Sequence, residues 1–460
     1  MNKTDPTQFL THKENLVAPE GDQRSPPLPL IVLASASPRR QSLLRQLGED
    51  FEIICADIEE RIEEGETPVR FAERMAQEKA LAVLSQLNHD HAQPRVVIGG
   101  DTVVALRGKV LGKPSSRENA HEMLSSLSGQ DHEVFSAWAI AKMNEDGKPL
   151  IISSGVSRTA VTMRVILPAE IESYLDSGEP MDKAGSYGIQ GLGGRFVSHL
   201  RGSFYSVIGM PLLEIFEALH SLQCLSSDPE FVRQGISLRE RCAYSAWRSG
   251  RAVDSVQVLA VSKRHSVAQM ELAKRCDFHH FGESYAQELL EKAEMFVDLA
   301  DGEFAQPVWH FIGGIQRNKA RRIGEVSQWV HGLTRLSEAE RLAEGAHSQG
   351  QVISVFIQVK LADEESKSGV SPSELRPLLI SLEKLEGLQV KGLMTFPPLA
   401  EPEESRVYFR ALRLLRDELE TEGFSLPHLS MGTSDDFEVA IEEGATWVRL
   451  GRCLFGERSH

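Results

Sequence analysis

The chain has 460 residues, 41% of them hydrophobic and 25% charged, a composition typical of soluble globular proteins. This length exceeds what one hydrophobic core usually covers, which predicts two or three domains. Fifty Lys and Arg stand against 66 Asp and Glu, so the formal net charge is −16, and no basic tract offsets it. A nucleic-acid backbone is therefore a poor candidate partner, and no apolar run approaches the roughly 18 residues of a membrane helix.

Residues 1–27 mix both charges with Pro and Gly and contain no apolar core of signal-peptide length. We expect a disordered leader there and no export from the cytoplasm. The five cysteines are scattered, odd in number and free of any Cys-x-x-Cys spacing. This pattern argues against a disulfide framework and a structural zinc site, and it fits a reducing cytoplasm.

A polar, Pro-containing stretch, Cys224-Leu-Ser-Ser-Asp-Pro-Glu, divides the chain. We expect a first domain over residues 28–221, a linker over 222–229 and a second domain over 230–460. Apolar strands alternate with amphipathic segments through the first of these, which predicts an α/β domain. A short polar linker permits two domains to behave independently.

The segment Leu33-Ala-Ser-Ala-Ser-Pro-Arg-Arg40 is typical of a strand, a tight turn and the start of a helix. Ser37 suits the N-cap and Gly48 the C-terminal stop. Arg39 and Arg40 fall in the first turn, where the positive end of the helix macrodipole disfavours cations. An anion bound by the free N–H groups and Arg39 would resolve the conflict, while a solvated helix start with two surface arginines is the simpler alternative.

Polar residues also interrupt the apolar pattern further along the first half. Asp101 follows Val-Val-Ile-Gly-Gly, and a charge buried in such a run without a partner is costly. A metal or a proton-transfer role would justify this carboxylate, and a plain turn residue is the alternative. Lys113 adds a cation in a Gly-Lys-Pro loop, and the Gly-rich stretch 182–194 permits close approach of the backbone to a ligand.

Four motifs in order, Ser-x-Ser-Pro-Arg-Arg, Gly-Asp-Thr-Val-Val, Gly-Lys-Pro and Asp-Lys-Ala-Gly-Ser-Tyr-Gly-Ile-Gln-Gly, resemble the Maf-type nucleoside triphosphate pyrophosphatases over nearly all of residues 28–220. The resemblance implies a Maf-type α/β domain that releases a nucleoside monophosphate and pyrophosphate. The arginine pair and Gln190 resemble the branch that acts on dTTP and UTP, whose pyrimidine edge suits an amide that donates and accepts. The alternative is a catalytically silent nucleotide-binding module.

The same resemblance implies roles for single residues. Asp101 is the catalytic proton acceptor and, with Glu60, a carboxylate facing Mg²⁺ or Mn²⁺, which prefer hard oxygen ligands. Phosphoryl transfer is catalysed mainly by positioning and charge neutralisation. The implied substrate-binding residues are Arg39, Thr102 and Gln190, which read the substrate, and Arg40, Lys79 and Lys113, which meet the triphosphate.

The second half alternates apolar strand candidates with helical patterns. Eight β/α units predict a closed, TIM-like (β/α)8 barrel, with an open doubly wound sheet as the alternative. Lys263, Glu283, Ser434 and Arg449 favour the barrel, because each follows a strand at the face where barrels build their sites. Strands are expected at 255–261, 278–282, 308–313, 329–332, 353–359, 389–394, 428–431 and 447–451, and helices at 231–249, 285–299, 371–385 and 405–422.

Lys263 directly follows an apolar run and, taken alone, would be a solvated residue at a strand end. The turn 432–434 follows the seventh strand, and Ser434 suits the N-cap of the next helix. Arg449 and Gly451 follow the eighth, and these two loops often bind phosphate in barrels. A phosphorylated aldehyde held opposite a lysine is the layout for pyridoxal 5′-phosphate (PLP).

Seven motifs resemble the pyridoxal phosphate homeostasis protein family over about residues 230–458. The resemblance implies that Lys263 is the Schiff-base lysine, that Arg449 lies near the ring nitrogen, and that Gly432, Thr433, Ser434 and Gly451 hold the phosphate. The His279-His280 pair is expected to be structural. The motifs are Ala260-Val-Ser-Lys263, His280-Phe-Gly-Glu283, Trp309-His-Phe-Ile-Gly313, Glu365-Ser-Lys-Ser-Gly369, Gly392-Leu-Met-Thr395, Ser430-Met-Gly-Thr-Ser-Asp-Asp-Phe437 and Val448-Arg-Leu-Gly451.

An amino-acid racemase-like PLP enzyme is the alternative for this half. Barrel racemases of this type add a β-domain whose tyrosine supplies a second acid or base, and here the chain ends nine residues after Gly451. Ser284 and Lys360 stand where the family usually has Asn. We therefore expect a cofactor-binding and delivery module joined to the hydrolase in one bifunctional chain. The sequence indicates neither an oligomeric state nor whether the halves touch.

Overall fold

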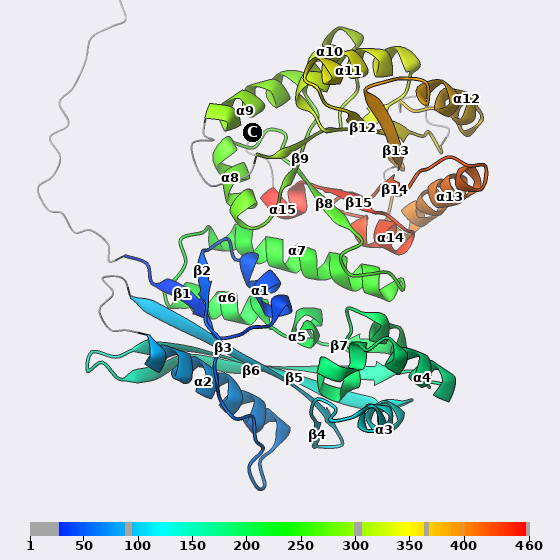
Figure 1. Ribbon diagram of the computed structural model, residues 1–460. Coiled ribbons are helices and arrows are strands. Elements are labelled where there is room, and N and C mark those ends of the chain that lie inside the picture. Colours follow the sequence, from blue (N-terminus) through cyan, green and yellow to red (C-terminus); the bar gives the residue numbers. More distant parts are fainter. Residues whose placement is uncertain (1–26, 88–93, 299–305, 363–367, 399, 457–460) are drawn as a thin grey trace, which may run out of the picture.

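The computed structural model describes residues 27–87, 94–298, 306–362, 368–398 and 400–456. An N-terminal α/β unit and a C-terminal closed barrel lie on either side of helix α7 (Pro229–Arg248), as Figure 1 shows. The expected leader lies outside the described residues, apart from residue 27. No described helix is long and apolar enough to cross a membrane. All five cysteines are described and free, as expected.

The N-terminal unit is built on a seven-stranded mixed sheet in the order β2-β1-β3-β5-β6-β7, with β4 paired to β3. Strand β1 pairs in parallel with β2 and β3, whereas β3, β5, β6 and β7 pair antiparallel along the rest of the sheet. The strands are β1 Leu30–Leu33, β2 Phe51–Ile53, β3 Arg95–Leu106, β4 Lys109–Leu111, β5 Asp131–Met143, β6 Pro149–Met163 and β7 Val197–Arg201.

Helix α2 (Pro68–Gln86) covers one face of this sheet with an apolar stripe of alanines, Phe71, Met75 and Val83. Ser37 and Pro38 begin α1 as expected, although the Ser37 side chain makes no capping hydrogen bond. The other helices of this unit are α1 Pro38–Arg45, α3 Arg117–Leu127, α4 Pro168–Asp176, α5 Phe204–Ile208 and α6 Leu212–Ser221, with 3-10 helices η1 Glu179–Asp182, η2 Ala184–Ser186 and η3 Leu192–Phe196.

Eight parallel strands close the C-terminal barrel, which confirms the TIM-like fold and excludes the open sheet. Side chains fill its interior, among them Val261, Phe356 and Trp447. The strands are β8 Gln257–Val261, β9 His280–Glu283, β10 Val308–Phe311, β11 Trp329–Leu333, β12 Ile353–Gln358, β13 Leu388–Met394, β14 His428–Ser430 and β15 Trp447–Leu450. The helices are α8 Val267–Arg275, α9 Ala286–Asp298, α10 Arg317–Val326, α11 Leu336–Ser348, α12 Pro372–Leu382, α13 Pro402–Thr421, α14 Phe437–Glu442 and α15 Arg452–Phe455.

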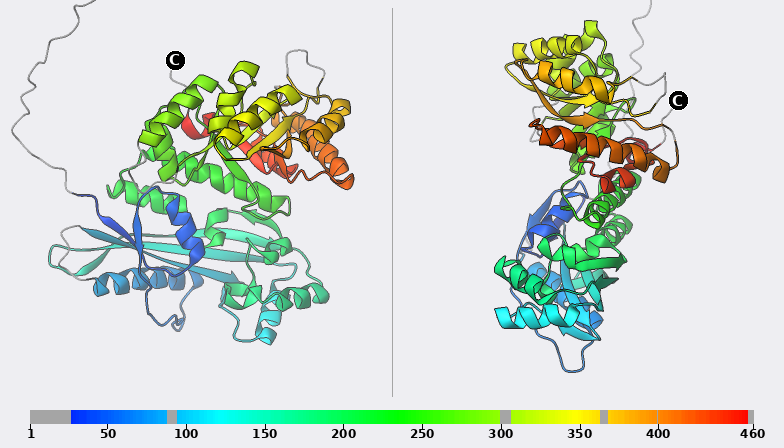
Figure 2. Two further views of the ribbon diagram at one scale, coloured as in Figure 1. Left: turned by 45° about the horizontal axis from the view of Figure 1, so that its top comes forward. Right: turned by 90° about the vertical axis from the view of Figure 1, so that its right-hand side faces the viewer.

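Helix α7 packs against both halves, and its place between them is visible in both views of Figure 2. The Phe204 ring lies 5.9 Å from that of Tyr244 and 5.7 Å from that of Trp247. Trp247 Nε1 also donates a hydrogen bond to the Gly194 carbonyl at 3.3 Å. On the barrel side α7 contacts α14 and α15. The halves therefore share one apolar interface, which differs from the independence that the polar linker permits.

Candidate functional sites

Asp101 lies inside strand β3, so the alternative of a plain turn residue is wrong. Its carboxylate accepts a hydrogen bond from Lys79 Nζ at 2.6 Å, and the same ammonium lies 2.6 Å from Glu60 Oε1. Lys79 comes from α2, which covers this face of the sheet, and both Lys79 and Asp101 are buried. The pairing explains how an apolar strand accommodates a charge, because the ammonium compensates the carboxylate.

Glu60 is the more exposed of the two carboxylates that share the Lys79 ammonium. Burial raises the pKa of Glu60, but the hydrogen bond and charge of Lys79, with the charges of Lys113 and Arg40, outweigh it and hold the pKa below its usual value. Two carboxylates next to each other are a fitting donor set for Mg²⁺ or Mn²⁺, which keep water and phosphate oxygens as further ligands. Among the described residues, no three or more His, Cys, Asp or Glu side chains are placed so that they could hold one metal ion together.

Arg40 is half-buried and turns back into the fold. Its Nε donates to the Gly209 carbonyl at 2.9 Å, one terminal nitrogen to Ser35 Oγ at 3.3 Å and the other to Thr102 Oγ1 at 3.1 Å. Burial lowers the pKa of Arg40. Arg39 is exposed. The alternative of two surface arginines is therefore correct for Arg39 and wrong for Arg40. The Ser35 and Gly209 partners were missed, although Ser35 belongs to the Ser-x-Ser turn that was singled out.

The Gly-rich segment is held beside the Lys113 loop. The Gly185 N–H donates to the Gly112 carbonyl at 3.0 Å. The Glu179 carboxylate accepts hydrogen bonds from the backbone N–H groups of Leu192 at 2.8 Å and Gly193 at 3.2 Å. Gln190 is half-buried between these anchored points, and its amide makes no hydrogen bond within the described part of the chain. The segment is thus fixed by its backbone, and its role in binding a base stays a prediction.

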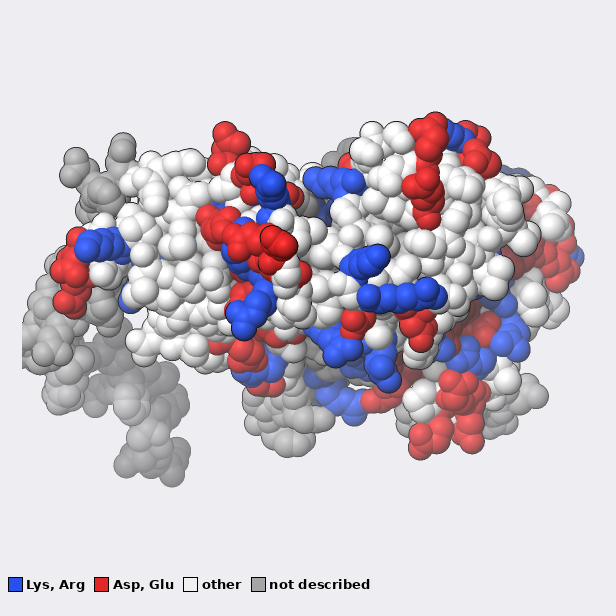
Figure 3. All heavy atoms as spheres, turned by 90° about the horizontal axis from the view of Figure 1, so that it is seen from below, with Lys and Arg blue, Asp and Glu red and all other residues white. Residues whose placement is uncertain are grey.

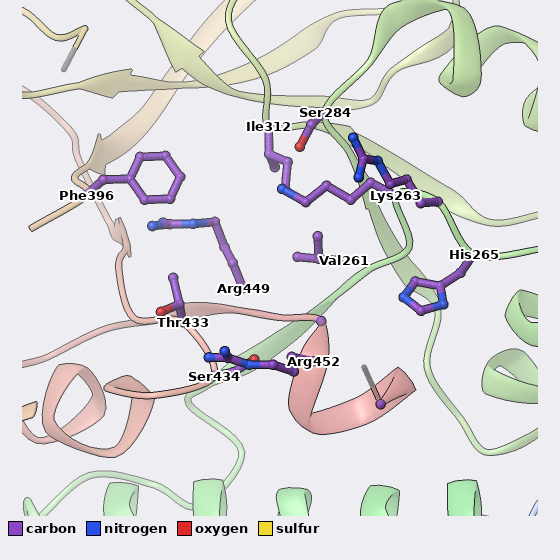
Figure 4. Close-up of a pocket in the computed structure, with 13 residues that line it drawn as sticks. Val261, Lys263, His265, Ser284, Ile312, Phe396, Thr433, Ser434, Arg449 and Arg452 are labelled. Carbon is purple, nitrogen blue, oxygen red and sulfur yellow. The ribbon is translucent and has the colours of Figure 1, made fainter. Parts of the chain in front are cut away.

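A pocket of about 780 Å³ opens at the C-terminal face of the barrel. In Figure 4 the Lys263 side chain extends into this pocket, with its amine on the side of Ile312 and Arg449. Thr433 and Ser434 lie across the pocket from this lysine. The lining residues are Val261, Lys263, Arg264, His265, Ser284, Ile312, Phe396, Thr433, Ser434, Arg449, Gly451, Arg452 and Gly456. The predicted cofactor residues therefore line one cavity, except Gly432, which directly precedes the lining residue Thr433. Of the family motifs, Glu365 to Lys367 lie outside the described residues.

The turn after β14 does not begin a helix at Ser434, so that expectation is wrong. Helix α14 starts at Phe437 with Asp436 as its N-cap. The Asp436 carboxylate accepts hydrogen bonds from the Thr433 backbone N–H at 2.6 Å and hydroxyl at 3.0 Å, which closes a turn before the helix. Gly432 has φ +93°, and a Cβ there would lie 2.6 Å from the Ala440 methyl. Only glycine fits at that position.

Arg449 is buried, and its guanidinium lies 4.2 Å from the centre of the Phe396 ring. One terminal nitrogen donates to the Ser430 carbonyl and hydroxyl, both at 2.8 Å, and the other to the Thr395 carbonyl at 2.9 Å. Burial lowers the pKa of Arg449 to about 10, so the group stays charged at neutral pH. Its buried Nε has no hydrogen-bond partner among the described residues, which fits a ligand that accepts one hydrogen bond.

The chain on the N-terminal side of Lys263 is held by a charged cluster that the sequence reading missed. Lys292 Nζ donates to the Ser262 carbonyl and to Glu283 Oε1, each at 2.7 Å, and to Glu288 Oε1 at 2.8 Å. The Ser262 hydroxyl donates to Glu283 at 2.7 Å. Of its members, Glu283 alone was singled out from the sequence, and the signal for Glu288 and Lys292 was their i,i+4 spacing, which is common on solvated helix faces.

Because the net charge is negative, anionic ligands need local cations, and both sites supply them. On the face of the molecule seen from below, acidic and basic side chains occur in small groups separated by uncharged surface (Figure 3).

Comparisons with known proteins match the two halves separately. Residues 30–222 match the family model described as Maf-like protein, and residues 246–459 match the alanine racemase N-terminal domain. A dTTP/UTP pyrophosphatase of Escherichia coli strain 536 is 46% identical over 195 residues, 42% of this chain and 94% of its own length. A pyridoxal phosphate homeostasis protein of Aquifex aeolicus is 43% identical over 223 residues, 48% of this chain and 95% of its own length. The structure of PipY from Synechococcus elongatus with PLP bound is 36% identical and covers 48% of this chain and 100% of its own, with a TM-score of 0.42.

Proposed function

The chain belongs to the Maf-like proteins through residues 30–222 and to the pyridoxal phosphate homeostasis proteins through its C-terminal half, and on this premise we propose that it is bifunctional. The N-terminal half hydrolyses dTTP and UTP to the nucleoside monophosphate and pyrophosphate. The C-terminal half binds PLP and serves PLP homeostasis. The observation that carries the first activity is the buried Lys79 ammonium between Asp101 and Glu60, and an open pocket that contains Lys263 carries the second.

For hydrolysis, Asp101 takes the proton from the attacking water, since its carboxylate is fixed by Lys79. Asp101 and Glu60 would hold Mg²⁺ or Mn²⁺, and the bound cation would neutralise charge on the phosphate groups. Arg40, Lys79 and Lys113 add positive charge toward the triphosphate. Arg39, Thr102 and Gln190 read the substrate, and Thr102 is hydrogen-bonded to Arg40.

Replacing the proposed base tests this activity. We expect the purified chain with Mg²⁺ or Mn²⁺ to release pyrophosphate from dTTP and UTP, and Asp101→Asn to lower kcat by about 100-fold or more, because proton transfer is lost. Asp131→Asn is the matched control, because Asp131 is an exposed strand residue bonded to Thr162. A rate in Asp101→Asn equal to the wild-type rate would contradict the assignment, and nucleotide binding without hydrolysis by the wild type would favour the silent binding module.

For PLP, Lys263 would hold the aldehyde end, the backbone and hydroxyls of 432–434 with Gly451 would hold the phosphate, and Arg449 would hold the ring nitrogen. The bound cofactor would supply an aldehyde that condenses with primary amines. A charged arginine at the ring nitrogen keeps that nitrogen unprotonated, which weakens the ring as an electron sink. The site therefore suits storage and delivery of the cofactor more than turnover of amino acids.

Chemical trapping tests the cofactor site. After borohydride reduction of the yellow protein and peptide mapping, we expect the pyridoxyl group on Lys263, and no visible absorption in Lys263→Ala. Lys384→Ala, an exposed lysine after α12, is the control and should remain yellow. A pyridoxyl group on another lysine would refute the assignment, and useful rates of alanine racemisation would favour the racemase alternative.

A further inference from the structure

Three histidines on neighbouring strands form a hydrogen-bonded chain inside the barrel. His280 Nδ1 lies 3.0 Å from His310 Nε2, and His310 Nδ1 lies 2.9 Å from His331 Nε2. The chain ends where His331 Nδ1 meets Ser430 Oγ at 2.8 Å, and the same oxygen accepts a hydrogen bond from Arg449. His310 and His331 are fully buried, whereas His280 is half-buried at the start of β9. The chain thus connects the N-terminal side of the barrel with the arginine of the pocket.

All three imidazoles are neutral at physiological pH. Burial lowers the pKa of His280 to about 4 and holds the pKa values of His310 and His331 well below the usual range. Trp329 and Trp447 pack against the ring of His310. Each neutral imidazole has one donor and one acceptor nitrogen, so the whole chain has two possible directions.

Arg449 decides between these directions. A guanidinium only donates hydrogen bonds, so Ser430 Oγ accepts one from Arg449. The hydrogen of the Ser430 hydroxyl then needs an acceptor of its own. Among the described residues, the only other polar contact of Ser430 Oγ is His331 Nδ1. In the reverse direction His331 would donate to Ser430, and the hydroxyl hydrogen would be buried without an acceptor, which is costly. His331 and His310 therefore carry their hydrogens on Nε2.

We propose that Ser430 and His331 are positioning residues for Arg449, and that His310 and His280 continue the hydrogen-bonded chain behind His331. This inference rests on the proposed PLP function. Because both terminal nitrogens of Arg449 are engaged by Ser430 and Thr395, Nε is the one guanidinium nitrogen without a partner in the described structure. The Nε hydrogen of Arg449 is thus left for a ligand atom that accepts one hydrogen bond, such as an aromatic nitrogen.

The tautomers can be measured directly in the full chain labelled with ¹⁵N-histidine, using long-range ¹H–¹⁵N correlation spectra at pH 7 without PLP. We expect His310 and His331 as neutral Nε2–H tautomers, a measurement that needs no variant. Ser430→Ala should shift both toward a mixture of tautomers, because the group that selects the direction is gone. Ser327→Ala is the control, since this buried serine hydroxyl has no partner among the described residues. Nδ1–H tautomers or charged imidazoles in the wild type would overturn the proposal.

PLP binding supplies a second readout. We expect Ser430→Ala to weaken PLP binding about tenfold, since Arg449 loses one of the hydrogen bonds that orient it, and Ser327→Ala to bind as the wild type does. A PLP affinity of Ser430→Ala equal to that of the wild type would overturn the positioning role alone. A wild-type protein that does not bind PLP at all would overturn both the proposed function and this inference, so the two failures are distinguishable.

Discussion

Two kinds of buried titratable side chain occur in this molecule, and they are stabilised differently. Asp101 pairs with the Lys79 ammonium, whereas His132 has a single hydrogen-bond partner and His310 lies within a hydrogen-bonded chain. His132 Nε2 lies 2.7 Å from the Tyr187 hydroxyl, and burial lowers the pKa of His132 to about 4. A charged pair needs a partner of opposite sign, while a neutral imidazole needs only a hydrogen-bond partner.

The lowered pKa of His132 predicts a loss of stability in mild acid. Between pH 6.5 and about 4 the unfolded state binds a proton at this histidine and the folded state does not, so the free energy of unfolding falls as the pH falls. The loss is about 1.4 kcal/mol per pH unit for one such group. Urea unfolding from pH 7 to pH 4 should therefore show a shallower pH dependence in His132→Gln than in the wild type.

His199→Gln, which replaces an exposed histidine on β7, is the control and should keep the wild-type pH dependence. If the free energy of unfolding of His132→Gln depended on pH as that of the wild type does, His132 would have the same pKa in the folded and unfolded states. The buried histidines of the barrel add to the slope in the same direction, because burial also lowers their pKa values.

At the scale of elements, hydrophobic patterning predicted the eight barrel strands and their order along the chain, because strands buried on both faces are continuous apolar runs. The predicted N-cap of α14 was wrong by two residues, since both Ser434 and Asp436 are good N-caps and the Asp436 carboxylate closes a turn on Thr433 first. The residue that compensates the buried Asp101 carboxylate was not predictable either. It is Lys79, which is 22 residues away in sequence.

The packing of α7 predicts that the two halves stay together without a covalent link. A chain cleaved by an engineered protease site near residue 225 should elute as one species in size-exclusion chromatography. Trp247→Ala in the cleaved chain should release the halves, because loss of a buried aromatic side chain costs about 3–5 kcal/mol.

Arg248→Ala is the matched control on the same helix, since Arg248 makes a surface ion pair with Glu442 at 3.5 Å and should contribute little. Separation of the halves on cleavage alone, with Trp247 intact, would show that the apolar interface is too weak to hold them.

At the scale of the whole molecule, the two sites lie in different units that share helix α7. On one side α7 contacts the Gly-rich segment through Trp247 and Gly194, and on the other it packs against α14 and α15, which follow the strands that carry the predicted phosphate-binding turn. The domain boundaries near 222–229 stay a prediction. The short segment there is tied to the first unit, because the Ser226 and Ser227 N–H groups donate hydrogen bonds to Glu49 at 2.6 and 3.0 Å.

The sequence by itself determined the fold class of both halves, the families and the candidate residues, because strand periodicity and short motifs are local properties of the chain. It also indicated that Lys263, Ser434 and Arg449 would lie at one face, since barrel topology places all strand ends together. Only the tertiary structure decided the partners of the charged groups: Lys79 between Asp101 and Glu60, Lys292 behind Ser262, and the histidine chain that ends at Ser430. Those contacts join residues far apart in sequence, so they depend on how the elements pack and leave no local pattern.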